Sequence, residues 1–137
     1  VRMERHCKNA LELAKYLERH ESVKWVNYAA LPNDRYYNVC KKITNGHASG
    51  IISFGIKGGK EAGAKFIDAL QMILRVLSMG DAKSLACHPA STLHRQLTPE
   101  QKALAGVSED LIRISVGIEH IDDIINDVEQ AIEASKK

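Results

Sequence analysis

The chain has 137 residues, of which 45% are hydrophobic and 26% charged, and its 19 Lys and Arg nearly balance 17 Asp and Glu. This composition excludes intrinsic disorder, and a net charge of +2 argues against a dedicated nucleic-acid-binding protein. No apolar stretch approaches the ~20 residues of a membrane span, and the first residues lack the apolar core of a signal peptide. We therefore expect one cytoplasmic domain over residues 1–137, with neither a membrane nor a nucleic acid as partner.

The charges and cysteines add two further observations. Residues 1–60 carry a net charge of +6 and residues 96–137 a net charge of −5. An anion-attracting basic half is one interpretation, but solvated faces on separate helices are the favoured one. Cys7, Cys40 and Cys87 are widely spaced and form no C-x-x-C motif, so they indicate small buried thiols and not a disulfide framework or a zinc site.

The first third of the chain predicts two helices around one strand. Apolar residues at helical spacing predict an amphipathic helix over residues 2–20. This helix starts without a capping residue, which suggests that the chain is cut from a longer one. Residues 23–28 are β-branched and aromatic and predict a strand, the turn at 31–34 follows, and residues 35–43 fit a short helix.

The middle of the chain predicts a strand, a glycine-rich break and a long helix. Residues 49–56 form the strand, and the break at 57–60 fits a tight turn better than a phosphate-binding loop, because it matches neither common phosphate motif. The helix is expected over residues 61–77, with its end at Gly80. Its apolar stripe consists of Phe66, Ile67, Leu70, Ile73, Leu74 and Leu77.

The last third predicts two strands and two helices. Residues 84–86 fit a short strand, and the Thr-Pro-Glu-Gln run from residue 98 is a capping box that starts a helix ending at Gly106. Residues 111–118 alternate, which predicts a strand with Ile112, Ile114, Val116 and Ile118 on one face. An amphipathic helix follows over residues 121–132. Together these elements predict an α/β or α+β fold, with helices on one face of a small, mostly antiparallel or mixed sheet.

Two kinds of residue could carry chemistry. His88 and His94 share a loop next to Cys87, but no H-x-x-x-H motif or matching carboxylate accompanies them, so we predict no metal site. Arg113 lies on the polar side of the alternating strand, with Ser115 and Gly117 leaving space beside it. Such a guanidinium could bind a carboxylate through two parallel hydrogen bonds, although from the pattern alone a solvated or salt-bridged arginine is the favoured interpretation.

Several motifs from residue 52 onward resemble the C-terminal domain of the Cys/Met-metabolism pyridoxal-phosphate enzymes, and residues 5–32 are similar to the entry into that domain. The resemblance covers nearly the whole chain. The motifs are the runs at residues 53–59, 80–85, 88–94, 112–119 and 122–125. It implies the fold of the small domain of fold-type I transferases, which agrees with the elements read above.

The resemblance also implies a binding site and a cofactor. Arg113 matches the arginine that holds the substrate's α-carboxylate. Ser78 matches a serine that the family has in a strand before the run starting at Gly80. Ser78 and the backbone at Met79 are expected to lie beside the carboxylate. The loop from His88 to His94 receives no catalytic role. The cofactor, pyridoxal phosphate, needs a Schiff-base lysine after a Ser-x-Thr pattern, and none of the twelve lysines follows a threonine. We therefore expect a fragment without the cofactor-binding domain, without catalytic residues of its own, and inactive alone.

The resemblance is strongest to the O-acetylhomoserine sulfhydrylases, which implies formation of homocysteine and acetate from O-acetylhomoserine and sulfide, a step of methionine biosynthesis. It implies a small amino-acid substrate and a homotetramer for the full-length protein. A methionine γ-lyase or cystathionine lyase would share the Arg113 site. A third hypothesis is a non-catalytic module that binds carboxylates or mediates assembly.

Overall fold

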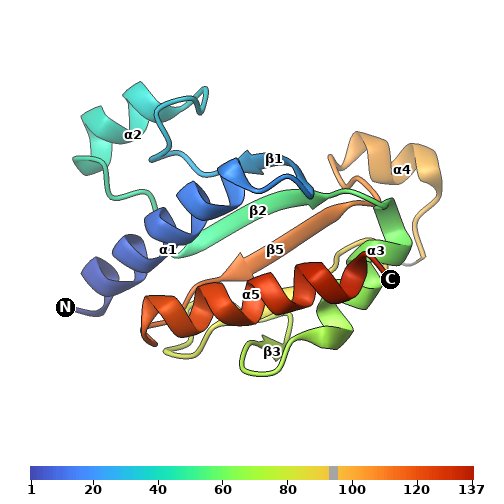
Figure 1. Cartoon of the computed structure of the whole chain (residues 1–137). Helices are drawn as coiled ribbons and strands as arrows, with labels where there is room; N and C mark the ends of the chain where they lie inside the picture. Colours follow the sequence, from blue (N-terminus) through green and yellow to red (C-terminus); the bar gives the residue numbers. More distant parts are fainter. Residues whose placement is uncertain (93–95) are drawn as a thin grey trace.

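Ten helices and strands make up the computed structural model of the chain, which describes residues 1–92 and 96–137 (Figure 1). The helices are α1 (Arg2–Arg19), α2 (Tyr37–Thr44), α3 (Gly59–Ala69), α4 (Pro99–Leu104) and α5 (Ile121–Ser135). The strands are β1 (Val23–Asn27), β2 (Ile51–Ile56), β3 (Leu74–Arg75), β4 (Leu85–Cys87) and β5 (Leu111–Ser115). No helix in the described part of the chain is long and apolar enough to cross a membrane.

The five strands form one sheet in the order β1-β2-β5-β4-β3. The pairs β1–β2, β2–β5 and β4–β5 are antiparallel, and only β3 runs parallel to β4. The predicted small, mostly antiparallel sheet is therefore confirmed. β5 is central, and its register places Arg113 between Ser53 of β2 and Cys87 of β4.

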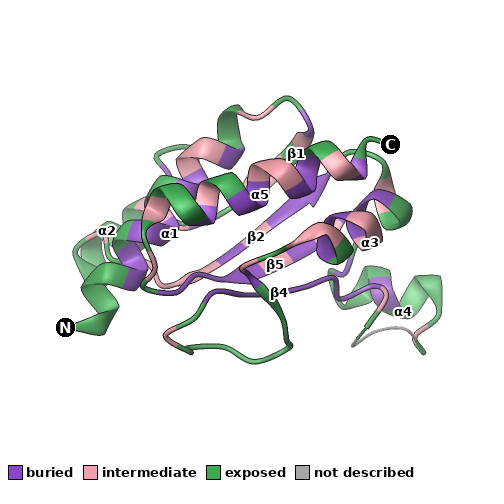
Figure 2. Cartoon of the chain, turned by 60° about the horizontal axis from the view of Figure 1, so that its bottom comes forward, coloured by how far each residue is buried: buried purple, intermediate pink, exposed green. Residues whose placement is uncertain are grey.

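One face of the sheet is covered by α1, α3 and α5, and we call it the covered face. Ile52 and Phe54 of β2 and Ile112 and Ile114 of β5 point into this layer and are fully buried. Phe54 packs edge-on against Phe66 of α3, with ring centroids 5.8 Å apart. α1 and α5 lie side by side across the sheet (Figures 1 and 2). The helical stripes read from the sequence thus form one hydrophobic core.

The opposite face, which we call the open face, carries the other set of strand residues. Ser53, Leu111 and Arg113 on this face are half-buried, and Trp25 of β1 lies over Gly55 of β2. A Cβ atom at Gly55 would overlap the Trp25 indole, so only glycine leaves the ring this close to the strand. Side-chain alternation therefore divides the sheet into an apolar face and a mixed face that carries the polar strand residues Ser53, Arg113 and Ser115.

The long helix predicted over residues 61–77 is wrong beyond residue 69, because α3 ends at Ala69. The carboxylate of Asp127 in α5 accepts hydrogen bonds from three consecutive backbone N–H groups, those of Gln71, Met72 and Ile73. These donors would otherwise bond within a continuing helix. The chain instead turns into β3, and Leu74 and Leu77 of the predicted stripe are exposed.

Three smaller predictions also need correction. The strand predicted to Ile118 ends at Ser115, and Ile118 is 37% exposed instead of sharing the covered face. The strand predicted from Ser49 begins at Ile51, because the Ser49 hydroxyl accepts from the Ile51 N–H in a local turn. Ser78 lies in the loop after β3 and not in a strand. The capping box at Thr98 is confirmed, since the Thr98 and Gln101 side chains each accept from the other's backbone N–H.

Candidate functional site

Arg113 marks the candidate site at the middle of the open face. Its neighbours on the flanking strands are Ser53 and Cys87, and its side chain is half-buried. Among residues 1–92 and 96–137, no carboxylate forms an ion pair with this guanidinium. A strand holds it in a fixed position, and a planar guanidinium presents paired N–H donors that match a carboxylate. The geometry therefore suits binding of an external anion.

The loop after β3 approaches Arg113 through its backbone. An Nη–H group of Arg113 donates to the carbonyl oxygen of Leu77 over 2.7 Å. Ser78 and Met79 follow directly and are exposed, with Met79 60% accessible to solvent. The structure thus brings the three residues of the predicted site, Arg113, Ser78 and Met79, into one region. Their roles in substrate binding stay predictions.

The far end of this loop is attached to the C-terminal end of β5. The Gly80 N–H donates to the Ser115 hydroxyl over 3.1 Å. The Glu119 carboxylate accepts from the backbone N–H and the hydroxyl of Ser84, at 2.6 and 2.9 Å. The Ser84 hydroxyl in turn accepts from the Gly117 N–H over 2.8 Å. These bonds hold the loop against the strand that carries Arg113.

Cys87 is the other ionisable group beside the guanidinium. Burial raises the pKa of the Cys87 thiol, and the positive charge and hydrogen bond of Arg113 oppose that rise in part. The residue is 3% exposed. A buried neutral thiol adds no charge next to Arg113, so the site keeps the guanidinium's positive charge for a ligand. The other two cysteines are also buried and free, as predicted.

His88 has a structural environment. Its Nε2 bonds to the Glu109 carbonyl oxygen at 2.8 Å, and its Nδ1 bonds to the Ser91 hydroxyl at 2.9 Å. The ring is fully buried against α3, where a Cβ at Gly63 would meet Nε2 at 2.7 Å. Both ring nitrogens are therefore engaged in the protein interior. His94, the other histidine of this loop, lies outside the described residues.

One group of side chains in the described part of the chain has the spacing of metal ligands. Single ligand atoms of His20, Glu129 and Glu133 lie within 4.8 Å of one another at the junction of α1 and α5. The Nδ1 of His20 accepts from the Ser22 N–H over 3.1 Å, so the neutral ring carries its proton on Nε2 and donates it to Glu129. A protonated nitrogen offers no lone pair to a metal. We interpret the group as a hydrogen-bond network, in which the Tyr16 hydroxyl also donates to Glu129.

Comparison with known proteins gives the family. The profile of the Cys/Met metabolism PLP-dependent enzymes matches residues 1–133. This chain belongs to that family. A crystal structure from Campylobacter jejuni, named as an O-acetylhomoserine (thiol)-lyase and carrying a pyridoxyl-lysine monophosphate, superimposes with a TM-score of 0.88 at 42% identity. That match covers 96% of this chain and 31% of the Campylobacter chain.

Curated relatives of this Cys/Met-metabolism chain have more than one activity in their names. The homocysteine synthase of Schizosaccharomyces pombe is 47% identical over 98% of this chain and 32% of its own length. The O-acetyl-L-homoserine sulfhydrylase of Leptospira meyeri is 48% identical over 96% and 30%. The L-methionine gamma-lyase of Pseudomonas putida is 46% identical over 98% and 34%. The chain thus spans about a third of the length of the relatives it matches.

The cofactor of the Cys/Met-metabolism family is pyridoxal phosphate. Within the described part of this chain Lys102 is the one buried lysine, and its amine donates to Glu109 at 3.0 Å and to the Ala90 carbonyl oxygen. That pairing does not fit a lysine that forms a Schiff base.

The sequence missed the groups that hold the loop in place. Glu119 was part of a recognised motif without a role, and Ser115 was noted only for its small size beside Arg113. A signal did exist in the sequence, since Glu119 is a carboxylate that directly follows the apolar end of the predicted strand over residues 111–118. The Leu77 carbonyl had no signal, because every residue carries a backbone carbonyl whatever its side chain.

Proposed function

We propose that this chain supplies the carboxylate-binding part of a PLP-dependent O-acetylhomoserine sulfhydrylase. Arg113 binds the α-carboxylate of the amino-acid substrate, with Ser78 and the backbone at Met79 beside it. The observation that supports this role is the position of Arg113 on a central strand, with a guanidinium that has no counter-ion within the described residues. A guanidinium without an internal partner keeps its paired N–H donors available for a carboxylate.

The proposed reaction converts O-acetylhomoserine and sulfide into homocysteine and acetate. The relatives named homocysteine synthase and O-acetyl-L-homoserine sulfhydrylase support it. Arg113 would orient the amino acid by its carboxylate, so that the bond to be broken is presented in one direction. We propose that the cofactor is held by the part of the relatives' length that this chain does not span. A cytoplasmic homotetramer is part of the same proposal.

A methionine γ-lyase activity is the second candidate, supported by the Pseudomonas putida relative. Both activities use an amino acid with a free α-carboxylate, so the Arg113 site serves either. They differ in the acceptor, because the sulfhydrylase adds sulfide and the lyase releases a thiol from methionine. Assays with O-acetylhomoserine plus sulfide and with methionine alone separate the two. A carboxylate-binding module without catalysis would be inactive in both assays.

The test uses the protein expressed from its natural reading frame. Its visible absorption spectrum is recorded during titration with O-acetylhomoserine, for the unmodified protein and for Arg113→Ala. We expect a cofactor band that responds to the amino acid, and about a 30-fold or greater loss of affinity in the variant, as for removal of one partner of a buried charge pair.

Arg75→Ala is the matched control. Arg75 lies on the exposed strand β3, pairs with Asp68 and does not contact Arg113, so its loss should leave the titration unchanged. An unchanged affinity in Arg113→Ala would refute the carboxylate-binding role. A protein that stays colourless when the cofactor is supplied would refute the proposed enzymatic function. The hypothesis of a non-catalytic carboxylate-binding module would then remain.

A further inference from the structure

We propose that Asp127 is a positioning residue for the carboxylate site, acting from α5 through the backbone of the segment that leads to Leu77. This inference rests on the proposed function of Arg113. Asp127 itself is not placed at the site. It fixes where the chain enters β3, and so where the Leu77 carbonyl and Ser78 lie relative to the guanidinium.

The bonds made by Asp127 are specific to one backbone path. Its Oδ1 accepts from the Gln71 N–H at 2.9 Å, and its Oδ2 accepts from the N–H groups of Met72 and Ile73 at 3.0 and 2.8 Å. The Gln130 amide donates to Oδ1 and to the carbonyl oxygen of Ala69, the last residue of α3. A single carboxylate thus satisfies three consecutive donors at the point where the helix stops.

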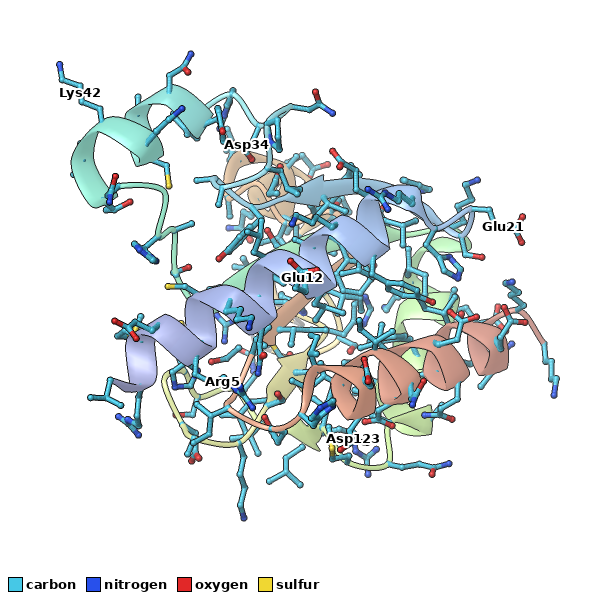
Figure 3. All side chains as sticks on the ribbon, turned by 60° about the vertical axis from the view of Figure 1, so that its left-hand side comes forward. Arg5, Glu12, Glu21, Asp34, Lys42 and Asp123 are labelled. Atoms are coloured by element: carbon cyan, nitrogen blue, oxygen red, sulfur yellow. The ribbon has the colours of Figure 1, made fainter. Side chains whose placement is uncertain are left out.

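The burial of Asp127 shows that this arrangement is built into the fold. The residue is 6% exposed and lies in the apolar stripe of α5, beside the fully buried Ile124 and Val128. A carboxylate is expensive to bury unless donors surround it, and here three backbone N–H groups and one amide do so. Asp122 and Asp123, on the first turn of the same helix, are exposed (Figure 3 labels Asp123).

The connection from Asp127 to the site is short. Leu77 follows Ile73 by four positions, and between them β3 is held through the Leu74 N–H to the Ser84 carbonyl and the Val76 N–H to the Ala86 carbonyl. Leu77 then accepts from Arg113.

Side-chain packing contributes little to this stretch, because residues 74–80 are all exposed. Its position depends on hydrogen bonds: the two to β4, the one from Arg113, and the two anchors at its ends, Asp127 before it and the Ser115 hydroxyl after it. Loss of the first anchor should therefore displace the Leu77 carbonyl and Ser78 without altering Arg113 itself.

The experiment compares two ligands in the protein expressed from its natural reading frame. L-homoserine has an α-carboxylate, and 3-aminopropan-1-ol is the same molecule without it. Spectral titration gives the Kd of each for the unmodified protein and for Asp127→Asn, Asp123→Asn and Arg113→Ala. In Asp127→Asn one oxygen becomes an NH2 group, which cannot accept from the Gln71 N–H or from the Met72 and Ile73 pair.

We expect Asp127→Asn to raise the Kd of L-homoserine about tenfold, in line with the loss of hydrogen bonds to a charged group, and to leave the Kd of 3-aminopropan-1-ol within about twofold. Asp123→Asn also removes one negative charge from α5 and should change the Kd of neither ligand. If Asp127→Asn weakens the binding of both ligands equally, or of neither ligand, the inference is overturned. If Arg113→Ala does not weaken L-homoserine binding, the proposed function fails instead.

A second variant covers the outcome in which Asp127→Asn does not fold. Gln130→Ala removes the amide that links Asp127 to the end of α3 but leaves the carboxylate and its three backbone bonds. It should raise the Kd of L-homoserine about threefold, as for loss of weaker bonds, with the same selectivity for the carboxylate ligand. Equal effects on the two ligands in this variant would likewise refute the positioning role.

Discussion

The two faces of β5 show how one strand serves both the fold and the site. Ile112 and Ile114 point to the covered face and are fully buried beneath the helices. Arg113, between them, points to the open face, is half-buried and bonds to the Leu77 carbonyl. A period of two residues separates the side chains completely, so the core holds the strand rigid while the opposite face presents a charge to a ligand.

This comparison implies that the two faces respond differently to substitution. A change on the covered face removes contacts that the core cannot replace, and its cost appears in the free energy of unfolding. A change at a half-buried residue of the open face, such as Ser53 or Arg113, disturbs fewer packed atoms, and its cost appears in binding or in the position of a single side chain. Substitutions at neighbouring residues of β2 test this difference directly, because Phe54 lies on one face and Ser53 and Gly55 on the other.

The largest effect is expected at Phe54. Phe54→Ala should lower the free energy of unfolding by about 3–5 kcal/mol, because it leaves a cavity and removes the edge-on contact with Phe66. Urea unfolding followed by circular dichroism measures the change. Ser53→Ala, one residue earlier on the open face, is the control and should stay within about 0.5 kcal/mol. Similar losses in the two variants would contradict the division between the faces.

A smaller effect is expected at Gly55, a position on the open face where the Trp25 side chain packs closely against the strand. Gly55→Ala places a methyl group where the Trp25 indole lies, so the ring must move and the free energy of unfolding should fall by about 1–3 kcal/mol. Trp25 is the single tryptophan of the chain, so its fluorescence reports the movement directly.

We expect the emission of Gly55→Ala to shift to longer wavelength as the indole becomes more exposed. Ser53→Ala should leave the emission spectrum unchanged. A spectrum of Gly55→Ala identical to that of the unmodified protein would mean that Trp25 does not lie over the strand as described.

Much of the fold was open to prediction because its determinants are local. Alternation in residues 51–56 and 111–115 is sufficient to place two strands and their buried faces, and the capping box at Thr98 specifies the start of α4. The end of α3 was not predictable in this way. Its determinant is the Asp127 carboxylate, which lies 54 to 56 positions away from the N–H groups that it binds.

Asp127 itself shows why the sequence misled. Among Asp122, Asp123 and Asp127, all in the first half of α5, the charge pattern fits an ordinary interaction with the helix dipole. Only the first two are exposed. The third lies within the apolar stripe, and a charged residue in such a stripe indicates a buried partner, although its identity could not be read from the pattern.

The candidate site combines residues that the sequence singled out with groups that it could not indicate. Alternation singled out Arg113 as a polar group on a buried strand, and the family resemblance added Ser78 and Met79. Sequence could not supply the Leu77 carbonyl that meets the guanidinium, because a backbone contact leaves no trace in residue identity.

The smallest effect is expected at an ion pair that joins the edge strand to the start of β5. Lys24 Nζ lies 3.1 Å from Asp110 Oδ2, and the two side chains are 46% and 11% exposed. Burial acts to raise the pKa of Asp110, but the hydrogen bonds from Ser108 and Lys24 and the Lys24 charge outweigh it, so the pKa lies below its ordinary value. The folded state therefore binds the proton less readily than the unfolded state, and the pair stabilises the fold above about pH 4.

Lys24→Met should lower the free energy of unfolding by about 0.5–1 kcal/mol at pH 7, a small amount because half of the lysine side chain is in water. The difference from the unmodified protein should vanish as the pH falls through the pKa of Asp110, where the carboxyl is neutral and attracts no cation. Urea unfolding at pH 7 and at a series of lower pH values down to about pH 2 measures the difference and its loss. Lys57→Met, at an exposed lysine outside any ion pair among the described residues, should show no such pH dependence. If Lys24→Met lowers the free energy of unfolding by the same amount at pH 7 and at the lowest pH, Lys24 acts through the packing of its aliphatic stem and not through its charge.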